Sequence, residues 1–238
     1  MNFRLLAMTT LGVLAAAGCS STDGSKAGEL GNGGFYFACT DAVSCTRYSD
    51  DAEKFPKAVS VGSSFQVRFT PKSSSSLSAS DSHINLTTGT DRGITISPVG
   101  EYISRGPNGL VALKLGYGTI TARDASGQLI DFVNIRVAKP DALVVYDAAV
   151  AHGETPSRIE SLTMSLSGSR QLRAFAQEKN SVLAGSLSVE WTVEPKSGVV
   201  DIIDSDGEVT ITPRAAGTAK LTASGGTFSQ EISVEVKP

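Results

Sequence analysis

The sequence from residue 187 to residue 236 alternates apolar and polar side chains in four separate runs. An alternation with a period of two places one set of side chains on the buried face of a β-strand and the other set in water. Glycine-rich segments separate the runs, as the turns of a small antiparallel sandwich require. We therefore expect four strands, whose inward residues are Val189, Trp191 and Val193; Val209 and Ile211; Ala219, Leu221 and Ala223; and Ile232, Val234 and Val236.

Four features of this region occur in a fixed order. Trp191 stands in the first strand, Gly207 opens the second, residues 216–223 read Ala-Gly-Thr-Ala-Lys-Leu-Thr-Ala, and the last strand ends at Val236. In these features the region resembles the bacterial immunoglobulin-like domains of group 2. The resemblance implies a β-sandwich that serves as an adhesion or spacer module of the cell envelope, and it brings no catalytic residue with it.

A second set of alternating runs lies upstream and mirrors the first. Residues 116–122 (Gly-Tyr-Gly-Thr-Ile-Thr-Ala) align without a gap on residues 217–223, and residues 109–113 align on residues 207–211. Self-similarity of this kind is the mark of a tandem repeat. The sequence therefore predicts an all-β protein with two tandem immunoglobulin-like β-sandwiches.

The boundary between the two predicted domains falls at Lys139-Pro140, because Pro ends the last strand of the first copy. We expect domain 1 at residues 55–139 and the group 2 domain at residues 140–238. The first copy lacks a counterpart of Trp191, so we expect Phe65 or Phe69 to fill that volume. Its expected inward residues are Phe65, Val67 and Phe69; Ile94 and Ile96; Val111, Leu113 and Leu115; Ile120 and Ala122; and Val133, Ile135 and Val137.

The amino-terminal residues have the features of a bacterial export signal. Arg4 precedes an apolar run from Leu5 to Ala17 that is too short to span a membrane. The run ends in Ala-Ala-Gly-Cys19, which resembles a lipobox. This resemblance implies that residues 1–18 are a lipoprotein signal peptide and that Cys19 is diacylated and becomes the mature N-terminus. The alternative is an ordinary signal peptide that is cut near Ala17, with Cys19 present by chance.

The residues after Cys19 bear on the location of the protein. Ser20, rather than Asp, resembles the outer-membrane sorting pattern of Gram-negative lipoproteins. Residues 19–34 are rich in Gly and Ser and poor in apolar side chains, so we expect a disordered tether. The predicted location is the bacterial cell envelope, with a lipid anchor in the outer membrane.

Cys39 and Cys45 are the two cysteines that remain after Cys19. In an exported chain they favour a disulfide, which would brace a segment at residues 35–54. The alternative is a redox-active or metal-binding pair. That alternative lacks the C-x-x-C spacing, and only His83 and His152 could add imidazole ligands.

Composition and motifs exclude several other classes of protein. The net charge is −3 and the isoelectric point is about 5.5, which gives no basic surface for nucleic acid. No apolar run reaches the ~18–20 residues that span a bilayer. The sequence has no G-x-S-x-G nucleophile elbow, phosphate-binding loop or dinucleotide fingerprint, so we expect neither an enzyme nor a bound cofactor.

One acidic cluster is a candidate for Ca²⁺. Asp204, Asp206 and Glu208 surround Gly207, as at the start of a Ca²⁺-binding loop, but the rest of the twelve-residue pattern is missing. Ser-Asp-Gly is also an ordinary hairpin turn, because Asp and Gly tolerate positive φ. The sequence favours the turn and leaves Ca²⁺ as the alternative.

Three aromatic residues are candidates for a ligand platform. Trp191 lies on an alternating strand, so we expect it in the core. Tyr102 and Tyr117 are the two candidates for exposed loop aromatics, although a strand edge or the rim of the core is the favoured position for both.

The features together indicate a non-enzymatic, membrane-anchored envelope lipoprotein that acts as a display or interaction module. The alternative is an outward-facing adhesin or carbohydrate-binding protein. The expected partners are the membrane, through the lipid anchor, and an envelope protein or a surface glycan.

Overall fold

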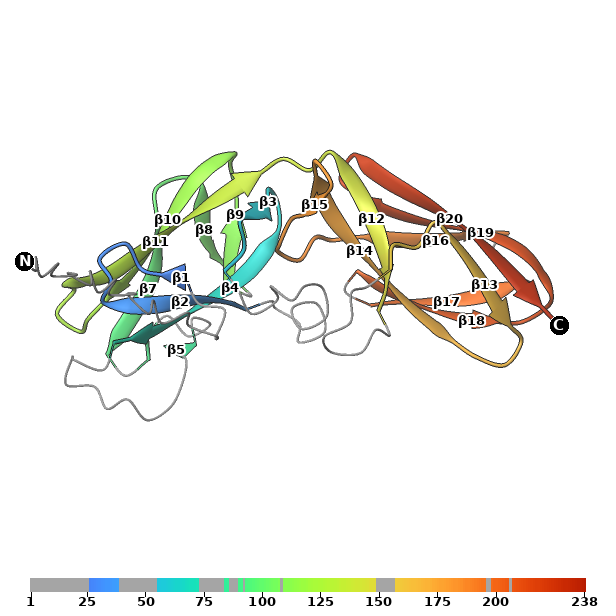
Figure 1. The fold of residues 1–238 in the computed structure, drawn as a ribbon, viewed down its shortest axis with the longest axis horizontal. Coiled ribbons are helices and arrows are strands. Elements are labelled where there is room, and N and C mark those ends of the chain that lie inside the picture. The colour runs from blue at the N-terminus through green and yellow to red at the C-terminus, as the bar shows by residue number, and fades with distance from the viewer. Residues whose placement is uncertain are drawn as a thin grey trace, which may run out of the picture.

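The structure, a computed structural model, describes residues 26–38, 55–72, 84–85, 90–91, 93–107, 109–148, 157–195, 198–205 and 207–238. These residues form β-strands and turns, and they build two β-sandwiches placed end to end (Figure 1). The described residues include no helix that is long and apolar enough to cross a membrane.

The first sandwich packs two sheets against each other. One sheet has the order β1-β2-β4-β9-β8, with β5 also paired to β4, and the other has the order β3-β11-β10-β7-β6. The strands are β1 (Lys26–Ala27), β2 (Gly33–Ala38), β3 (Ala58–Ser60), β4 (Ser64–Pro71), β5 (Ile84–Asn85), β6 (Thr90–Asp91), β7 (Ile94–Val99), β8 (Ile103–Gly106), β9 (Gly109–Ala112), β10 (Gly116–Arg123) and β11 (Leu129–Ala138).

The second sandwich also has two sheets. One has the order β12-β14-β18-β17, with β15 paired to β14, and the other has the order β13-β20-β19-β16. The strands are β12 (Ala142–Asp147), β13 (Ser161–Ser165), β14 (Arg170–Glu178), β15 (Ser181–Val182), β16 (Glu190–Glu194), β17 (Val200–Ser205), β18 (Glu208–Pro213), β19 (Gly217–Gly225) and β20 (Phe228–Lys237).

The two sandwiches repeat one strand order. The path β2-β4-β9-β8 corresponds to β12-β14-β18-β17, and β3-β11-β10-β7 corresponds to β13-β20-β19-β16. In both copies the second strand (β3, β13) pairs in parallel with the last one (β11, β20). Sheets of the orders A-B-E-D and C-F-G define the immunoglobulin constant-type sandwich. The prediction of two tandem immunoglobulin-like β-sandwiches is confirmed.

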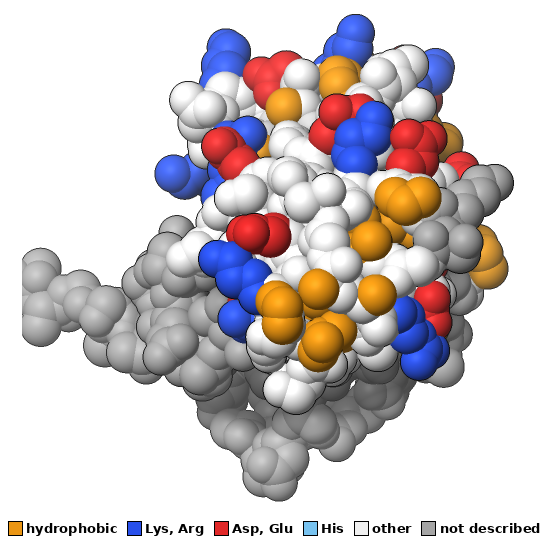
Figure 2. Space-filling view, turned by 90° about the vertical axis from the view of Figure 1, so that its right-hand side faces the viewer, with side chains coloured by type: hydrophobic (Ala, Val, Ile, Leu, Met, Phe, Trp, Pro, Cys, Tyr) orange, Lys and Arg blue, Asp and Glu red, His pale blue; other side chains and the backbone are white. Residues whose placement is uncertain are grey.

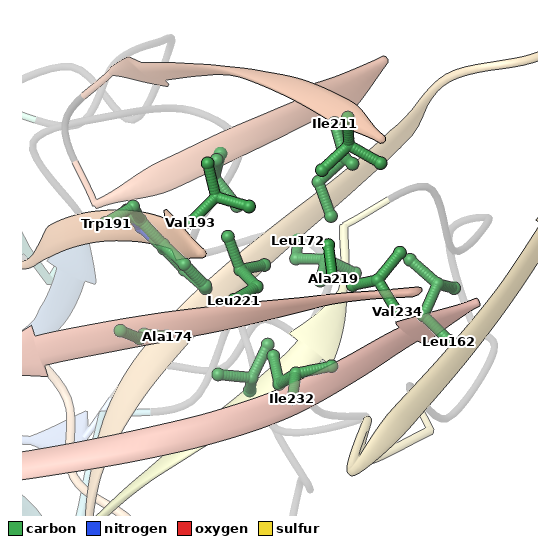
Figure 3. Packing of buried hydrophobic residues seen from close by; sticks show 14 of the residues in the cluster. Leu162, Leu172, Ala174, Trp191, Val193, Ile211, Ala219, Leu221, Ile232 and Val234 are labelled. Atoms are coloured by element: carbon green, nitrogen blue, oxygen red, sulfur yellow. The ribbon is translucent and has the colours of Figure 1, made fainter. Parts of the chain in front are cut away.

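Alternation accounts for the core of the second sandwich. Trp191 and Val193 of β16 are buried, whereas the other three residues of that strand are exposed. Figure 3 shows buried side chains from strands of both sheets meeting in the space between them, among them Leu172, Leu221 and Ile232. Burying such a side chain contributes ~1.5–3 kcal/mol. All inward residues predicted for residues 187–236 are buried.

The first core is also as predicted, except at β9. Phe65, Val67 and Phe69 are fully buried. On β9, however, Leu110 and Ala112 point inward, whereas Leu113 is 50% exposed and Leu115 is 52% exposed. The expectation that Val111, Leu113 and Leu115 face the core is therefore wrong by one residue. The run Leu-Val-Ala-Leu is apolar in both phases, so alternation cannot decide which phase faces inward.

The amino-terminal part of the described chain belongs to the first sandwich. β2 is the counterpart of β12, and it pairs with β4 along its whole length. Phe35 of β2 is fully buried, with its ring centroid 4.8 Å from that of Phe69. The structure thus differs from the expected tether over residues 26–34, and it gives domain 1 a strand upstream of residue 55. Residues 19–25 and 39–54 lie outside the described residues.

A buried carboxylate fastens this amino-terminal hairpin. Asp131 of β11 has no exposed surface. Its Oδ1 accepts the N–H groups of Leu30 (2.8 Å) and Phe132 (2.8 Å), and its Oδ2 accepts those of Asn32 (2.7 Å) and Gly33 (3.0 Å). Four hydrogen bonds to one carboxylate meet the cost of burying its charge. Asp131 therefore joins the β1–β2 turn, in one sheet, to β11 in the other.

The two sandwiches are connected by more than the chain between β11 and β12. The segment 183–187 of the second sandwich runs along β3 and the start of β4 of the first, and we call this contact the joint. Ser60 N–H donates to Ala184 O (2.9 Å), and Ala184 N–H donates to Ala58 O (3.1 Å). Ser64 and Ser186 exchange two further backbone hydrogen bonds, of 3.0 and 2.8 Å.

The joint also has an apolar centre and an ion pair. Ala58 and Ala138 of the first sandwich pack against Ala176 and Leu183 of the second, and all four are buried. At its edge the guanidinium of Arg136 holds the carboxylate of Glu178 in a bidentate pair, with one N···O distance of 3.1 Å. Backbone pairing, apolar burial and a forked ion pair together fix the two sandwiches relative to each other.

Substitution of Gly185 by Ala should uncouple the two sandwiches. Gly185 has a φ of +95°, and a Cβ at this position would lie 2.1 Å from Ser63 Oγ, which is buried. We expect the wild type to melt in one transition and Gly185→Ala to melt in two, because the clash separates segment 183–187 from the first sandwich. Differential scanning calorimetry measures this.

Gly226→Ala is the matched control for the Gly185 substitution. Gly226 also has a positive φ, of +61°, but no atom lies within 4 Å of the position that a Cβ would take, and Gly226 takes part in none of the joint's backbone hydrogen bonds given above. Both variants carry the backbone strain of a positive φ. If Gly226→Ala also melts in two transitions, strain within the second sandwich and not the joint is the cause.

Candidate interaction surface

Several sites predicted from the sequence lie outside the described residues. These are Cys19, the Cys39–Cys45 pair, and both histidines, His83 and His152. The lipid anchor and the disulfide therefore stay predictions.

The Ca²⁺ candidate is in a hairpin between β17 and β18, where Ser205 pairs with Glu208. Asp206 lies outside the described residues. Asp204 Oδ2 accepts the N–H of Trp191 at 3.4 Å, and Glu208 lies 3.5 Å from the buried guanidinium of Arg173. Two of the three carboxylates thus have protein partners, and the described residues contain no group of three potential metal ligands. The alternative of a Ca²⁺ site stays a prediction without support from this geometry.

The aromatic candidates occupy three different environments. Trp191 is 5% exposed and belongs to the core, as predicted. Tyr102 is partly buried and packs against the first core, which agrees with a position at its rim. Tyr117, in contrast, is 67% exposed on the outer face of β10. Of the two positions expected for Tyr117, the core rim is therefore wrong; a strand edge agrees with the structure, because Tyr117 pairs with Arg136 of β11 whereas the pairing of β10 with β7 begins at Thr119.

Tyr117 belongs to a larger exposed apolar group. Leu113, Leu115 and Tyr117 are each at least half exposed and lie within five residues of one another, from the β9–β10 turn into β10. We call these three exposed residues the rim, a name that from here on does not refer to the rim of the core. Single exposed apolar residues are common, but several together on one turn form a candidate interaction surface.

The second sandwich contains the same turn and serves as an internal comparison. In the first copy the N–H groups of Leu113 and Lys114 donate to Tyr102 O at 2.7 and 3.3 Å. In the second copy the N–H groups of Arg214 and Ala215 donate to Val199 O at 2.8 and 3.3 Å. The glycine that follows has positive φ in both copies, +137° at residue 116 and +152° at residue 217.

The side chains of the two turns differ although the backbones agree. Arg214, Ala216 and Thr218 of the second copy stand where the first copy has Leu113, Leu115 and Tyr117. The turn therefore forms without large apolar side chains. The stability of the fold does not account for the rim.

Two ion pairs flank the rim. Lys114 pairs with Glu101, and Arg136, the cross-strand neighbour of Tyr117, pairs with Glu178 across the joint. The hydrogen bond from Arg136 lowers the pKa of Glu178, and the hydrogen bond to Glu101 raises the pKa of Lys114. Glu178 and Lys114 therefore remain charged at neutral pH. The three apolar residues of the rim thus lie between charged pairs of balanced sign. A protein interface has the same arrangement, with an apolar centre and a polar border.

The far end of the second sandwich has a different character. Figure 2 shows charged side chains of both signs there, with smaller groups of apolar side chains between them. Leu166 is 45% exposed, and Arg214 Nε donates to Asp201 Oδ2 at 2.6 Å. This end lacks a concentration of large apolar residues comparable to the rim among its described residues. The rim is thus the stronger candidate surface.

Comparison with known proteins gives no family for this chain. No family model matches it, and no curated protein matches it either. Among solved structures it is similar to domains 4 and 5 of the S-layer protein SbsC, with 13% identity over 80% of this chain and 88% of that one, and a TM-score of 0.32. It is also similar to the adhesin InvE of Yersinia pseudotuberculosis, with 15% identity over 77% of this chain and 57% of that one, and a TM-score of 0.31.

A glycosidase from Bacteroides vulgatus is similar at the same level, with 14% identity over 53% of this chain and 18% of that one, and a TM-score of 0.28. Scores this low do not separate an adhesin from a domain of an enzyme. The assignment of the fold rests on the strand order of the two sandwiches, and the function rests on the residues of this chain.

Proposed function

We propose that this protein is a non-enzymatic envelope lipoprotein of the bacterial outer membrane that presents two immunoglobulin-like sandwiches as an interaction module. The observation that carries the proposal is the lipobox-like sequence at Cys19 followed closely by a rod of two coupled sandwiches. Acyl chains on Cys19 would anchor the chain, since each buried CH₂ contributes about 0.8 kcal/mol.

The position of the first strand sets how far the module stands from its anchor. β1 begins at Lys26, seven residues after Cys19. Seven extended residues span at most about 25 Å. The first sandwich would therefore stay close to the membrane, while the coupled second sandwich extends away from it. A short connection and a fixed joint suit a display role.

Replacement of Cys19 by Ser tests the anchor. We expect the wild type to fractionate with membranes and Cys19→Ser to be released, because the acylated side chain is lost. Both proteins are also labelled in intact cells with a membrane-impermeant biotin reagent. The labelling shows whether each protein is exposed on the cell surface. Retention of Cys19→Ser in the membrane fraction would contradict the proposed anchor.

The same labelling distinguishes the second candidate, an outward-facing adhesin or carbohydrate-binding protein. The 67% exposure of Tyr117 favours this candidate, because an exposed ring can stack on a sugar. An adhesin must label in intact cells. A protein that labels only after the envelope is opened has periplasmic partners, and the adhesin is then excluded.

A further inference from the structure

The rim requires an explanation outside the fold. Leu113, Leu115 and Tyr117 are 50%, 52% and 67% exposed, and the equivalent turn of the second sandwich keeps its backbone hydrogen bonds with Arg, Ala and Thr at these positions. Burial of exposed Leu and Tyr side chains favours association with another protein surface.

We propose that the rim is a docking surface for a second copy of this chain. The charged residues beside the rim indicate which kind of partner fits this surface. Lys114 and Arg136 supply two cations, and Glu101 and Glu178 supply two anions. In a twofold contact the same surface meets itself, so it must be complementary to itself in charge. A surface with balanced charges meets this condition, whereas a surface of one sign would repel its copy.

The position of the rim fits two copies that lie side by side. Gly62 N–H donates to Ala112 O (2.8 Å), and Ser64 pairs with Ser186 across the joint, so the rim begins next to the joint. It therefore lies between the two ends of the rod. This step rests on the proposed function: two copies anchored in one membrane are parallel, and a twofold axis normal to the membrane brings their rims together.

The second sandwich supplies the substitutions that test the proposal. The variant Leu113→Arg, Leu115→Ala, Tyr117→Thr gives the first turn the side chains of the second turn, which forms the same backbone. Ile203→Thr is the matched control, because Ile203 is also 67% exposed but belongs to β17. Thermal melting of both variants verifies that they fold.

Sedimentation equilibrium of the purified full-length protein in detergent measures the association. We expect a monomer–dimer equilibrium for the wild type and Ile203→Thr, and a dissociation constant at least about tenfold weaker for the triple variant, since truncating Tyr at an interface has effects of this size. A wild-type monomer, or equal dissociation constants for all three proteins, would overturn the proposal.

Crosslinking in cells distinguishes a second copy from another protein. With a bismaleimide reagent, Leu115→Cys should give a product of twice the mass, and Ile203→Cys should not; the unmodified chain controls for its own cysteines. A Leu115→Cys product of any other mass means that a different protein occupies the rim and overturns the proposal. If the wild type dimerises in detergent but Cys19→Ser stays in the membrane fraction, the docking surface is supported and the proposed lipid anchor is wrong.

Discussion

Substitution of Asp131 by Ala should lower the melting temperature of the first sandwich by roughly 10 °C or more. The carboxylate is fully buried and accepts four backbone N–H groups, three of which belong to the β1–β2 hairpin: two in the turn and that of Gly33, which begins β2. Its removal leaves these donors without their acceptor in a buried or partly buried place. Each buried unsatisfied group costs ~1–3 kcal/mol, so we expect a total loss of about 4 kcal/mol.

The loss should be concentrated at the amino-terminal hairpin. In Asp131→Ala the amide hydrogens of Leu30, Asn32 and Gly33 should exchange faster than those of β10 and β11, because the hairpin is released before the sandwich unfolds. Hydrogen exchange followed by mass spectrometry or NMR measures this difference. Uniform loss of protection over the whole first sandwich would show that Asp131 does not act through the hairpin.

Asp124→Ala is the matched control. Asp124 Oδ1 accepts the N–H groups of Ser126 (2.9 Å) and Gln128 (2.9 Å) and the hydroxyl of Ser126 (2.6 Å), but it lies in the exposed β10–β11 turn. Water can replace it there, so the melting temperature should change far less than in Asp131→Ala. Equal shifts would mean that burial of the Asp131 carboxylate is not what makes it important.

The parts of the fold that sequence reasoning predicts well are those with strict alternation. β10 and β19 have the sequence patterns that align without a gap, and their equivalent residues Ile120 and Leu221 are both fully buried. Their partners, β11 and β20, alternate as well. From Val133 to Val137 of β11 and from Ile232 to Val236 of β20 only one phase is apolar, so the pattern alone determines which face is buried there.

Sequence reasoning missed the features that depend on contacts between distant segments. Asp131 stands in the inward phase of β11, in step with Val133 and Ile135, and a carboxylate in a core phase is the signal that a buried acceptor is needed. The sequence did not predict β2 as a strand of the first sandwich, because the residues before it are rich in Gly. Its aromatic residues nevertheless correspond to the apolar start of β12. The rim lies where a continuous apolar run fixes no phase, and only the packing of Leu110 and Ala112 decides it.

Substitution of Trp191 by Ala should cost about 3–5 kcal/mol of the free energy of unfolding, as expected for a large buried aromatic residue. The ring is 5% exposed and packs in the core of the second sandwich, opposite Ala223 on β19. Denaturation followed by circular dichroism measures the change, because the protein has one Trp and fluorescence is lost with it. An unchanged midpoint would place the ring outside the core and restore it as a candidate ligand platform.

Trp191→Phe separates the volume of the ring from its polar atom. Trp191 Nε1 is buried without a hydrogen-bond partner, which costs ~1–3 kcal/mol. Phe removes this donor but leaves a smaller ring, so the two effects oppose each other and the net change should stay within about 1 kcal/mol. The first sandwich has Ile96 at the equivalent position, paired with Ala122, which shows that an aliphatic side chain can fill this place in the same fold. If Trp191→Phe destabilises as much as Trp191→Ala, the indole N–H makes a favourable contribution to the core, contrary to the cost expected for a buried donor without a partner.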